Sequence, residues 1–444
     1  QLDVAAVDAW LRQAIPDLAP GLPAVTQYSG GASNWTYRLR YATRDLVLRR
    51  PPAGTKAKSA HDMAREFRIQ QALKPVYPAV PTVVALCQDP AVIGCDFYVM
   101  DRIEGLIPRA PLPAGLTLGP DAARRLCTAW VDALVDLHAV DPRAAGLEAL
   151  GRGPGYARRQ VEGWSDRYLR ARTWNVPTFA RVRAWLHAHV PEDVDACVIH
   201  NDWRLDNVVV DPADPARVVG VLDWEMATIG DPLMDLGSAL AYWVHADDPW
   251  LLRATRRQPS DVPGMLRRED IVARYLDRTG RRPADWTFYE VFGLFRLAVI
   301  VQQIYFRYHH RQTRNPAFRH FWVLVHAFDR RCRRLLDPPR RPGRPHPTPR
   351  PRRGREICIG LVTDEPFGPV ITFGAGGTMI ELINDRAMEL PPLNQFLARR
   401  LIDRSRVAET LGEWRGASAV DMEALESVLL RVSELVCALP QLRE

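Results

Sequence analysis

The chain has 444 residues, of which 47% are hydrophobic, so it can bury one large core or several smaller ones. Its formal net charge of +7 matches the seven arginines of one acid-free tract, 338–355. The rest of the chain is therefore close to neutral, which argues against a nucleic-acid partner. No apolar run approaches the roughly 18 residues that span a membrane, which argues against a membrane partner. Seven singly spaced cysteines and an N-terminus without a signal-peptide pattern fit a cytoplasmic protein with neither a zinc cage nor a disulfide framework.

The first hundred residues have the pattern of a small, mostly antiparallel sheet with one helix. Residues 24–50 contain three β-like segments separated by turns. Residues 61–73 have helical spacing of their apolar side chains. Two more predicted strands, "TVVALCQ" and "DFYVMDR", complete a β-rich lobe.

From residue 121 onward helical spacing dominates, which predicts a second, helical lobe. The expected helices cover 122–140, 156–170, 179–190, 231–244 and 286–311. The exceptions are "CVIHNDWRLDNVVV" (197–210) and "RVVGVLD" (217–223), which are predicted to form a polar-studded hairpin. A cleft between two such lobes is where a ligand is expected.

The tract "PPRRPGRPHPTPRPRRGR" (338–355) separates these lobes from a smaller C-terminal piece. Frequent proline blocks helices and central strands, and like charges repel, so we expect an extended spacer rather than a basic docking site. Beyond it, "EICIGLVTD", "PVITFGAG" and "TMIELIND" are predicted strands, followed by helices over 393–411 and 421–439.

The polar residues of the predicted hairpin suit phosphoryl transfer, which needs mainly positioning and charge neutralisation. Asp202 can orient an attacking hydroxyl or accept its proton, and Arg204 can neutralise the transferring group. Asn207 and Asp223 offer oxygen ligands to Mg²⁺. Each residue alone also fits a turn or a cap, but the whole His-x-Asp-x4-Asn pattern with a later strand-ending Asp favours a catalytic site.

Through "HNDWRLDN…VLDWEMATIGDPLMDL" the chain resembles the aminoglycoside phosphotransferase-like kinases, and closest the branch related to kinase domains fused to acyl-CoA dehydrogenases. The resemblance spans about residues 25–336 and implies a protein-kinase-like fold. It implies that Asp202 is the catalytic aspartate and that Asn207 and Asp223 bind Mg²⁺.

The same resemblance assigns His200 and Asp235 to bracing the loop. Position 201 is Asn where the family usually has Gly. Since Asn tolerates a positive φ best after Gly, activity is expected to survive this departure.

The resemblance also implies an ATP site in the first lobe, with no Walker-type motif. The turn in "YSGGASNWTYRL" would bring backbone N–H groups to the phosphates. Arg49 stands where protein kinases have a lysine, with Glu66 as its ion-pair partner. The implied nucleotide-binding residues are Gly30, Gly31, Ser33, Arg49, Glu66 and, beside the adenine, Met100, Asp101 and Arg102. The cofactors implied are ATP and Mg²⁺.

The acceptor is expected to be a hydroxyl on a small molecule. Residues 156–168 and 295–312 are rich in Arg and aromatic side chains, which suits an anionic or acyl-bearing acceptor such as a hydroxyacyl-CoA. Three alternatives stay open: an aminoglycoside or amino alcohol as acceptor, a nucleotide-binding pseudokinase or scaffold, and acyl-CoA ligase-related chemistry in the C-terminal piece.

"VTDEPFGPVITFGAGGTMIELINDRAMELPPLN" resembles the ATP-grasp part of NDP-forming acyl-CoA synthetases and of ATP-grasp-fused protein acetyltransferases. The matching residues are Gly374, Gly376, Gly377 and Glu381. The first half of an ATP-grasp domain has no counterpart in this sequence. The sequence also does not include the Asp-Ile-Asn-Pro segment of that family. We therefore expect a fragment that does not bind ATP productively, and three interpretations stay open: a folded remnant, a docking unit for a protein partner, or a product of gene fusion.

The predicted fold class is α+β, a two-lobed protein-kinase-like fold with a short C-terminal α/β ATP-grasp-like fragment. The expected divisions are 1–103 for the N-lobe, 104–337 for the helical C-lobe, 338–355 for the spacer and 356–444 for the fragment.

Overall fold

The structure is a computed structural model that describes residues 2–28, 34–52, 62–192, 194, 196–337, 357–364, 368–375, 386–413 and 419–438. The chain divides into two compact units, Gln1–Arg340 and Arg341–Glu444. Each unit is described by itself. The predicted spacer 338–355 lies outside the described residues.

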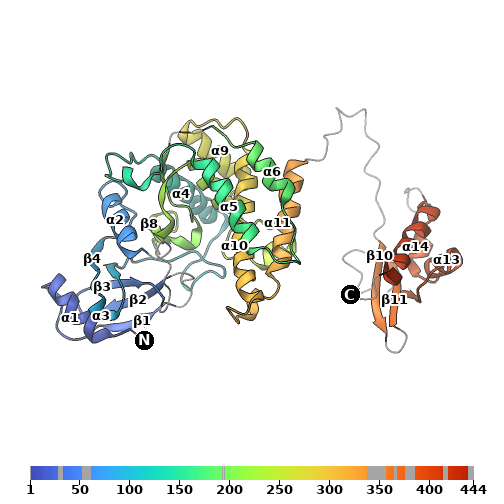
Figure 1. The fold of residues 1–444 in the computed structure, drawn as a ribbon, viewed down its shortest axis with the longest axis horizontal. Helices are drawn as coiled ribbons and strands as arrows, with labels where there is room; N and C mark the ends of the chain where they lie inside the picture. The colour runs from blue at the N-terminus through green and yellow to red at the C-terminus, as the bar shows by residue number, and fades with distance from the viewer. Residues whose placement is uncertain are drawn as a thin grey trace. The chain divides into compact units, whose positions relative to one another are not determined.

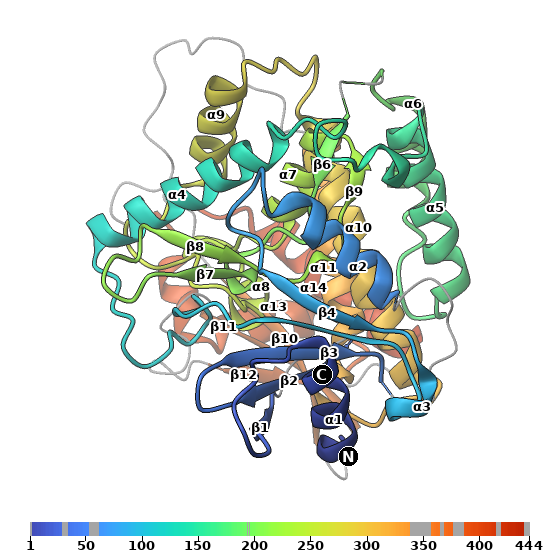
Figure 2. The same ribbon diagram turned by 90° about the vertical axis from the view of Figure 1, so that its left-hand side faces the viewer.

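The first unit begins with a five-stranded antiparallel sheet of order β1-β2-β3-β5-β4 (Figure 1). The strands are β1 (Ala24–Gln27), β2 (Trp35–Arg40), β3 (Asp45–Arg50), β4 (Val83–Cys87) and β5 (Phe97–Asp101). Helix α1 (Val4–Ala14) covers one face and α2 (Met63–Leu73) the other, as Figure 2 shows. Helix α1, capped by Asp3, and the short α3 (Pro90–Ile93) were not predicted from the sequence.

Strand alternation decides which side chains of β3 meet which helix. Leu46 and Leu48 belong to the cluster of core residues on the α1 face. Val47 packs with Met63 of α2 on the opposite face. Arg49 therefore points toward α2, where its partners lie.

The helical lobe is built around α10 (Thr287–His309), which packs against α5, α7 and α11. Its other helices are α4 (Pro120–His138), α5 (Tyr156–Ala171), α6 (Ala180–Ala188), α7 (Pro232–Ala241), α8 (Trp250–Ala254), α9 (Arg268–Thr279) and α11 (Phe321–Leu336). Two glycines let α7 and α10 cross closely, because a Cβ on Gly237 would lie 2.4 Å from the Tyr289 carbonyl oxygen and one on Gly293 would lie 2.1 Å from that of Gly237.

Four short strands carry the polar loop, but they pair differently from the prediction. Strand β6 (Cys197–Ile199) pairs with β9 (Thr228–Gly230), and β7 (Val208–Val210) pairs with β8 (Val218–Val221). The predicted hairpin of 197–210 with 217–223 is thus correct for β7 and β8 only, since β6 pairs with a strand that follows both.

The segment that joins the lobes crosses directly over β7. Leu106 exchanges two backbone hydrogen bonds with Val210, of 2.9 and 2.8 Å. Gly105 has φ of 152°, and a Cβ there would lie 2.5 Å from the Val210 carbonyl oxygen. Only glycine fits this crossing, which fixes the connector against the catalytic region.

One helix, α10, has the length and composition of a membrane span, although the sequence analysis did not single it out. Its apolar window is 72% buried inside the fold, as expected for the core helix of a lobe. All seven cysteines fall within the described ranges and are unpaired, so the predicted absence of a disulfide framework is confirmed.

The second unit has a three-stranded antiparallel sheet of β10 (Ile357–Asp364), β11 (Gly368–Ala375) and β12 (Ala387–Glu389). Helices α13 (Gln395–Asp403) and α14 (Met422–Ala438) share a core with β11 and β12. The first two predicted strands are present. The predicted strand at 378–385 and the residues Gly376, Gly377 and Glu381 lie outside the described residues, whereas Gly374 is in β11 opposite Cys358.

Candidate active site

The polar loop between β6 and β7 is held from below by one buried carboxylate. Asp235, on α7, is fully buried and accepts hydrogen bonds from the backbone N–H groups of His200 (2.8 Å) and Asn201 (2.9 Å). It also contacts Nε2 of His138 at 3.2 Å. Burial opposes its ionisation, but His138 and the backbone donors hold the pKa of Asp235 below its usual range. Asp235 therefore has the position that the sequence analysis gave it, between α7 and the loop.

His200 is fully buried, and both ring nitrogens are engaged. Its Nε2 lies 3.0 Å from the Leu222 carbonyl oxygen, to which it donates. Its Nδ1 accepts a 3.3 Å hydrogen bond from the backbone N–H of Asp202. This ring links the loop to the end of β8 and has no lone pair left for a proton in transit.

Asn201 has a positive φ, 64°, the case in which Asn is the best-tolerated residue after Gly. Its side-chain amide donates to the Met226 carbonyl at 3.1 Å, and its amide oxygen accepts from the Tyr156 hydroxyl at 3.4 Å. A glycine could adopt the same backbone but could make neither contact.

Asp202 and Asn207 are brought together as the sequence pattern predicted. The amide nitrogen of Asn207 donates to the backbone oxygen of Asp202 at 2.9 Å and to its Oδ2 at 3.0 Å. The Oδ1 atoms of both residues accept no hydrogen bond from the described residues. One carboxylate oxygen and one amide oxygen are thus available to ligands.

The guanidinium of Arg204 is engaged by more side chains than the sequence pattern indicated. Its Nη2 lies 3.2 Å from Oδ2 of Asp202, its Nε lies 3.4 Å from Asp206, and its guanidinium sits over the ring of Tyr242. Burial opposes its charge, but the two carboxylates raise the pKa of Arg204. Arg204 therefore fixes the Asp202 side chain at the same time as it supplies positive charge.

Asp223 lies at the end of β8 in the left-handed region, with φ of 70°. Its Oδ1 accepts a 2.8 Å hydrogen bond from Arg49, whose other end lies 3.0 Å from Glu66 on α2. The predicted Arg49–Glu66 ion pair is confirmed. Burial opposes ionisation of Asp223, but Arg49 holds its pKa below the usual range.

The remaining nucleotide-side predictions have mixed outcomes. Gly30, Gly31 and Ser33 lie outside the described residues, although the flanking β1 and β2 pair antiparallel. Met100 is buried against α2.

The connector residues Asp101 and Arg102 are committed to the sheet. Their side chains pair with Arg44 and Asp45, and their backbone N–H groups donate to the carbonyls of Thr82 and Asp45. The backbone N–H groups of these two residues are therefore not available to an adenine.

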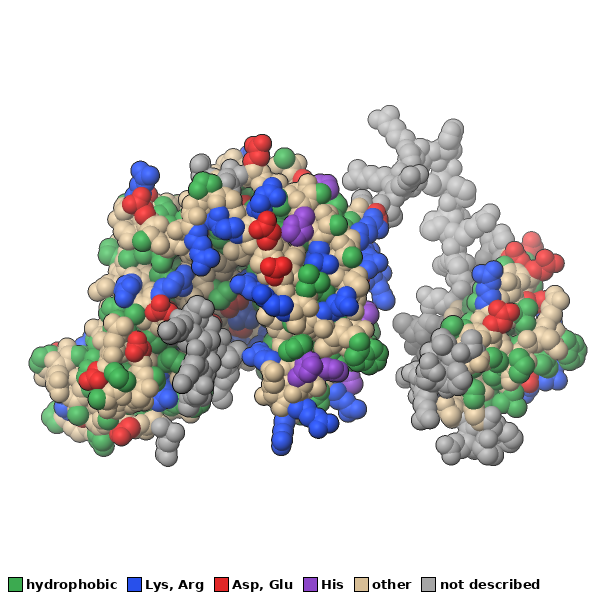
Figure 3. All heavy atoms as spheres, viewed as in Figure 1, with side chains coloured by type: hydrophobic (Ala, Val, Ile, Leu, Met, Phe, Trp, Pro, Cys, Tyr) green, Lys and Arg blue, Asp and Glu red, His purple; other side chains and the backbone are tan. Residues whose placement is uncertain are grey.

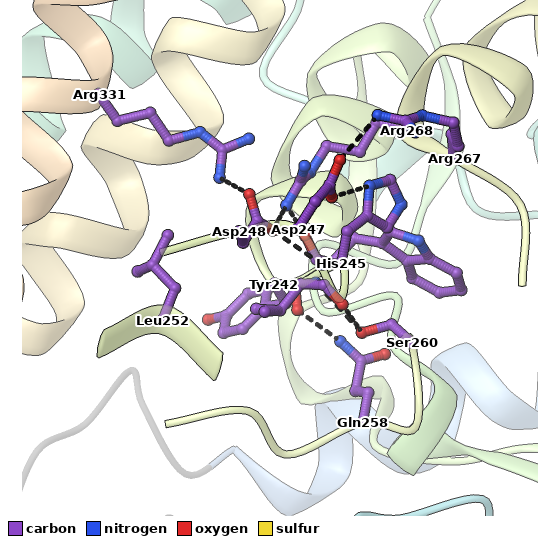
Figure 4. Close-up of polar contacts among 12 residues, drawn as sticks. Tyr242, His245, Asp247, Asp248, Leu252, Gln258, Ser260, Arg267, Arg268 and Arg331 are labelled. Atoms are coloured by element: carbon purple, nitrogen blue, oxygen red, sulfur yellow. Dashed lines mark hydrogen bonds and ion pairs between the residues drawn. The ribbon is translucent and has the colours of Figure 1, made fainter. Parts of the chain in front are cut away.

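One residue that sequence reasoning missed, Gln258, holds the loop from the side. Gln258 accepts a 2.7 Å hydrogen bond from the backbone N–H of Leu205 and donates to the Tyr242 carbonyl at 3.2 Å. Figure 4 shows the polar contacts around Gln258. Asp248 lies between Arg268 and Arg331, and the Ser260 hydroxyl exchanges hydrogen bonds with the backbone of Val244. No local signal marks Gln258, because its importance comes from a contact 53 positions away in the sequence.

One side of the polar loop is lined by cationic and aromatic side chains. Arg296 of α10 donates to the Asn201 carbonyl at 2.7 Å and lies over the ring of Trp164 on α5. The predicted acceptor segments, 156–168 and 295–312, therefore meet beside the catalytic loop. A cavity of about 460 Å³ opens at the far end of α10, lined by Tyr305, Tyr308, His309, Arg311, Thr313 and Arg314.

A two-lobed fold with this set of residues at the junction of the lobes defines a kinase-like phosphotransferase. The model of the phosphotransferase enzyme family matches residues 24–271, so the chain belongs to this family, and the predicted fold and enzyme class are confirmed.

Two relatives illustrate the similarity. The mouse (Mus musculus) protein named acyl-CoA dehydrogenase family member 10 is 38% identical over 304 residues, which cover 68% of this chain and 28% of the mouse protein. The chain thus spans little more than a quarter of that relative. A crystal structure from Ralstonia eutropha JMP134, described as an aminoglycoside phosphotransferase, superposes with a TM-score of 0.64 at 28% identity over 76% of this chain and 99% of that one.

The C-terminal unit has separate relatives. The ATP-grasp domain model matches residues 346–444. The beta subunit of acetate–CoA ligase (ADP-forming) I of Pyrococcus furiosus is 33% identical over 91 residues, covering 20% of this chain and 39% of that subunit. The predicted partial ATP-grasp resemblance is confirmed.

Proposed function

We propose that the chain is a Mg-ATP-dependent kinase that phosphorylates a hydroxyl group of a small molecule. The observation that supports this most is the convergence of Asp202, Asn207 and Asp223 from two separate strand pairs, with Arg49 and Glu66 reaching the same place from the N-lobe. Side chains this far apart in sequence meet here without a core-packing reason to do so.

The residues present fit a magnesium ion. Oδ1 of Asn207 has no hydrogen-bond donor among the described residues, and Asp223 engages Arg49 through only one of its carboxylate oxygens. Mg²⁺ prefers such hard oxygen ligands and commonly uses one or two from the protein, with phosphates completing the site. When bound, the ion would neutralise charge on the nucleotide phosphates.

Asp202 is arranged to receive the acceptor. Asn207 and Arg204 hold its Oδ2, so Oδ1 can accept a hydrogen bond from the acceptor hydroxyl and orient its oxygen. The new bond joins that oxygen to the γ-phosphorus as the bond to the bridging β–γ oxygen breaks, and the hydroxyl proton passes to Asp202. Arg204 offsets the negative charge of Asp202 through their ion pair. Its guanidinium is already in place before the substrate binds, so this charge needs no rearrangement during the reaction.

For the acceptor we propose an anionic or acyl-bearing molecule, with a hydroxyacyl-CoA as the leading candidate. Arg296 and Arg167 beside the loop support it, and so does the name of the mouse relative, an acyl-CoA dehydrogenase family member. A polycationic aminoglycoside would meet like charge here. The description of the Ralstonia structure keeps this alternative worth testing.

The test is an ATP-consumption and phosphate-transfer screen of the full chain against hydroxyacyl-CoAs, amino alcohols and aminoglycosides, with Asp202→Asn as the matched inactive control. Transfer to a hydroxyacyl-CoA that requires Asp202 is the expected result. Mg-ATP binding without transfer to any acceptor would favour the pseudokinase alternative. Formation of a thioester from an acid, ATP and CoA would favour the ligase-related one.

A further inference from the structure

Trp164, on α5, has two arginine side chains on its indole ring. The guanidinium carbon of Arg167 lies 4.5 Å from the ring centroid, and that of Arg296 lies 5.2 Å from it. Arg296 is only 6% exposed, whereas Arg167 lies at the exposed surface of α5. Figure 3 shows Lys and Arg side chains over this part of the helical lobe, with acidic side chains among them.

The positive charge of this pair has no counterion. Within the part of the chain that the structure describes, no carboxylate lies within 4.0 Å of either guanidinium, whereas the buried Arg49 pairs with Glu66 and Asp223, and the partly buried Arg204 and Arg268 also have carboxylate partners. Burial lowers the pKa of Arg167, and the nearby charges of Arg296 and Arg170 lower it further. Arg296 is the buried member of the pair, and a buried, unpaired cation is unfavourable unless a ligand offsets its charge.

The place of the pair indicates what that ligand is. Arg296 donates to the carbonyl of Asn201, the residue before Asp202, so the pair lies on the acceptor side of the catalytic carboxylate. A purely structural role for Arg296, as the donor to the Asn201 carbonyl, would need only a neutral side chain. Such a role would also not explain why Arg167 lies on the same ring. The remaining N–H groups of the Arg296 guanidinium donate to no described residue.

We propose that Arg296 and Arg167, together with the Trp164 ring that both guanidinium groups contact, form a subsite for an anionic carboxylate or phosphate group of the acceptor. The proposal rests on the proposed function, since Asp202 defines which side the acceptor occupies. The guanidinium plane matches both oxyanions with two parallel hydrogen bonds. The subsite selects acceptors that carry such a group near the reacting hydroxyl and rejects polycations.

The experiment is calorimetric titration of the full chain saturated with Mg-AMPPNP, which keeps phosphate probes out of the nucleotide site. The probes are 3-hydroxybutyrate for a carboxylate, coenzyme A for phosphate and kanamycin for a polycation. We expect one of the two anions to bind and kanamycin not to bind. Arg296→Gln should weaken that anion by about tenfold to a hundredfold and Arg167→Gln by somewhat less, because charged hydrogen bonds are lost.

Two further variants make the result specific. Arg158→Gln, on the exposed surface of α5 and away from the ring contacts, is the matched charge control and should change affinity less than twofold. Arg296→Lys should recover part of the affinity. If Arg296→Gln unfolds, Arg167→Gln still decides the question, because its side chain makes no contact with the loop.

Two outcomes overturn the subsite: no binding of either anion to the parent, or binding that Arg167→Gln leaves unchanged. The proposed function is judged separately by Asp202-dependent phosphate transfer. Anion binding that depends on Arg167, without phosphate transfer to any acceptor, would support the subsite and refute the proposed kinase activity. Phosphate transfer that depends on Asp202, without anion binding, would support the kinase activity and refute the subsite.

Discussion

Replacing Asp235 with alanine should loosen the catalytic loop and destabilise the whole helical lobe. The carboxylate accepts from two backbone N–H groups, of His200 and Asn201, and from the ring of His138. Asp235, His138 and the His200 N–H are buried and the Asn201 N–H is partly buried, so water replaces the carboxylate poorly. His138 is itself fixed from the other side by the Tyr275 hydroxyl at 2.6 Å.

The size of the effect follows from the number of donors left without a partner. Each buried donor that loses its acceptor costs about 1–3 kcal/mol. Three such donors, partly relaxed and not additive, give an expected loss of about 3–5 kcal/mol in the free energy of unfolding, in the range found when one partner of a buried pair is removed. The loop should also become mobile, so the turnover number should fall more than the affinity for ATP.

Urea unfolding and steady-state kinetics of parent and variant measure both effects. The matched control is Asp231→Ala, because Asp231 is also buried and starts the same helix, where it caps the N–H groups of Leu233 and Met234 and bonds the Tyr289 hydroxyl but does not contact the loop. Loss of such a cap costs about 1 kcal/mol. An Asp235→Ala variant no less stable than the Asp231→Ala variant would refute the bracing role. Asp235→Asn, which keeps one acceptor, should fall between them.

Three further outcomes follow from the same geometry. Asp202→Asn should reduce phosphate transfer at least a hundredfold with an unchanged urea midpoint, and parental turnover by this variant would contradict the mechanism. Arg49→Lys keeps the charge but cannot reach Glu66 and Asp223 together, so the KM for ATP should rise several-fold in initial-rate measurements, and an unchanged KM would contradict this role. Burial raises the pKa of Asp231 from 3.8 to about 6, so its stabilising contribution is full below about pH 4 and is lost as the pH rises through 6. The stability of the parent relative to Asp231→Asn, which keeps the cap, should therefore drop by about 3 kcal/mol between pH 4 and pH 8, and a flat difference would argue against the shift.

The sequence predicted the residues that chemistry constrains locally. Asp202, Asn207 and Asp223 occur at fixed spacing around short strands, because one loop and one strand end must present them together. Arg49 and Glu66 were predictable for a related reason, since strand alternation and helical spacing decide which faces carry them. These five side chains meet as the pattern indicates.

Other features depend on contacts that no local pattern records. Strand β6 pairs with β9, which follows β8, and it also contacts α7 and α4, all of them elements distant in the sequence. Gln258 looks like an ordinary polar loop residue until the fold places it on Leu205. The engagement of Arg204 by Asp206 and Tyr242 was equally invisible, because it depends on side-chain direction within a tight turn.

Asn201, the one departure from the family pattern, bears directly on whether the site is active. A pseudokinase reading needs this residue to disturb the loop, yet its φ of 64° lies in the region that Asn tolerates best after Gly. Its side chain joins the catalytic loop to the Met226 carbonyl, three residues past Asp223, and to Tyr156 on the acceptor side. The substitution thus ties together the three parts of the site that must keep their spacing during transfer. Because it adds contacts and removes none, the departure supports a working kinase rather than a degenerate one.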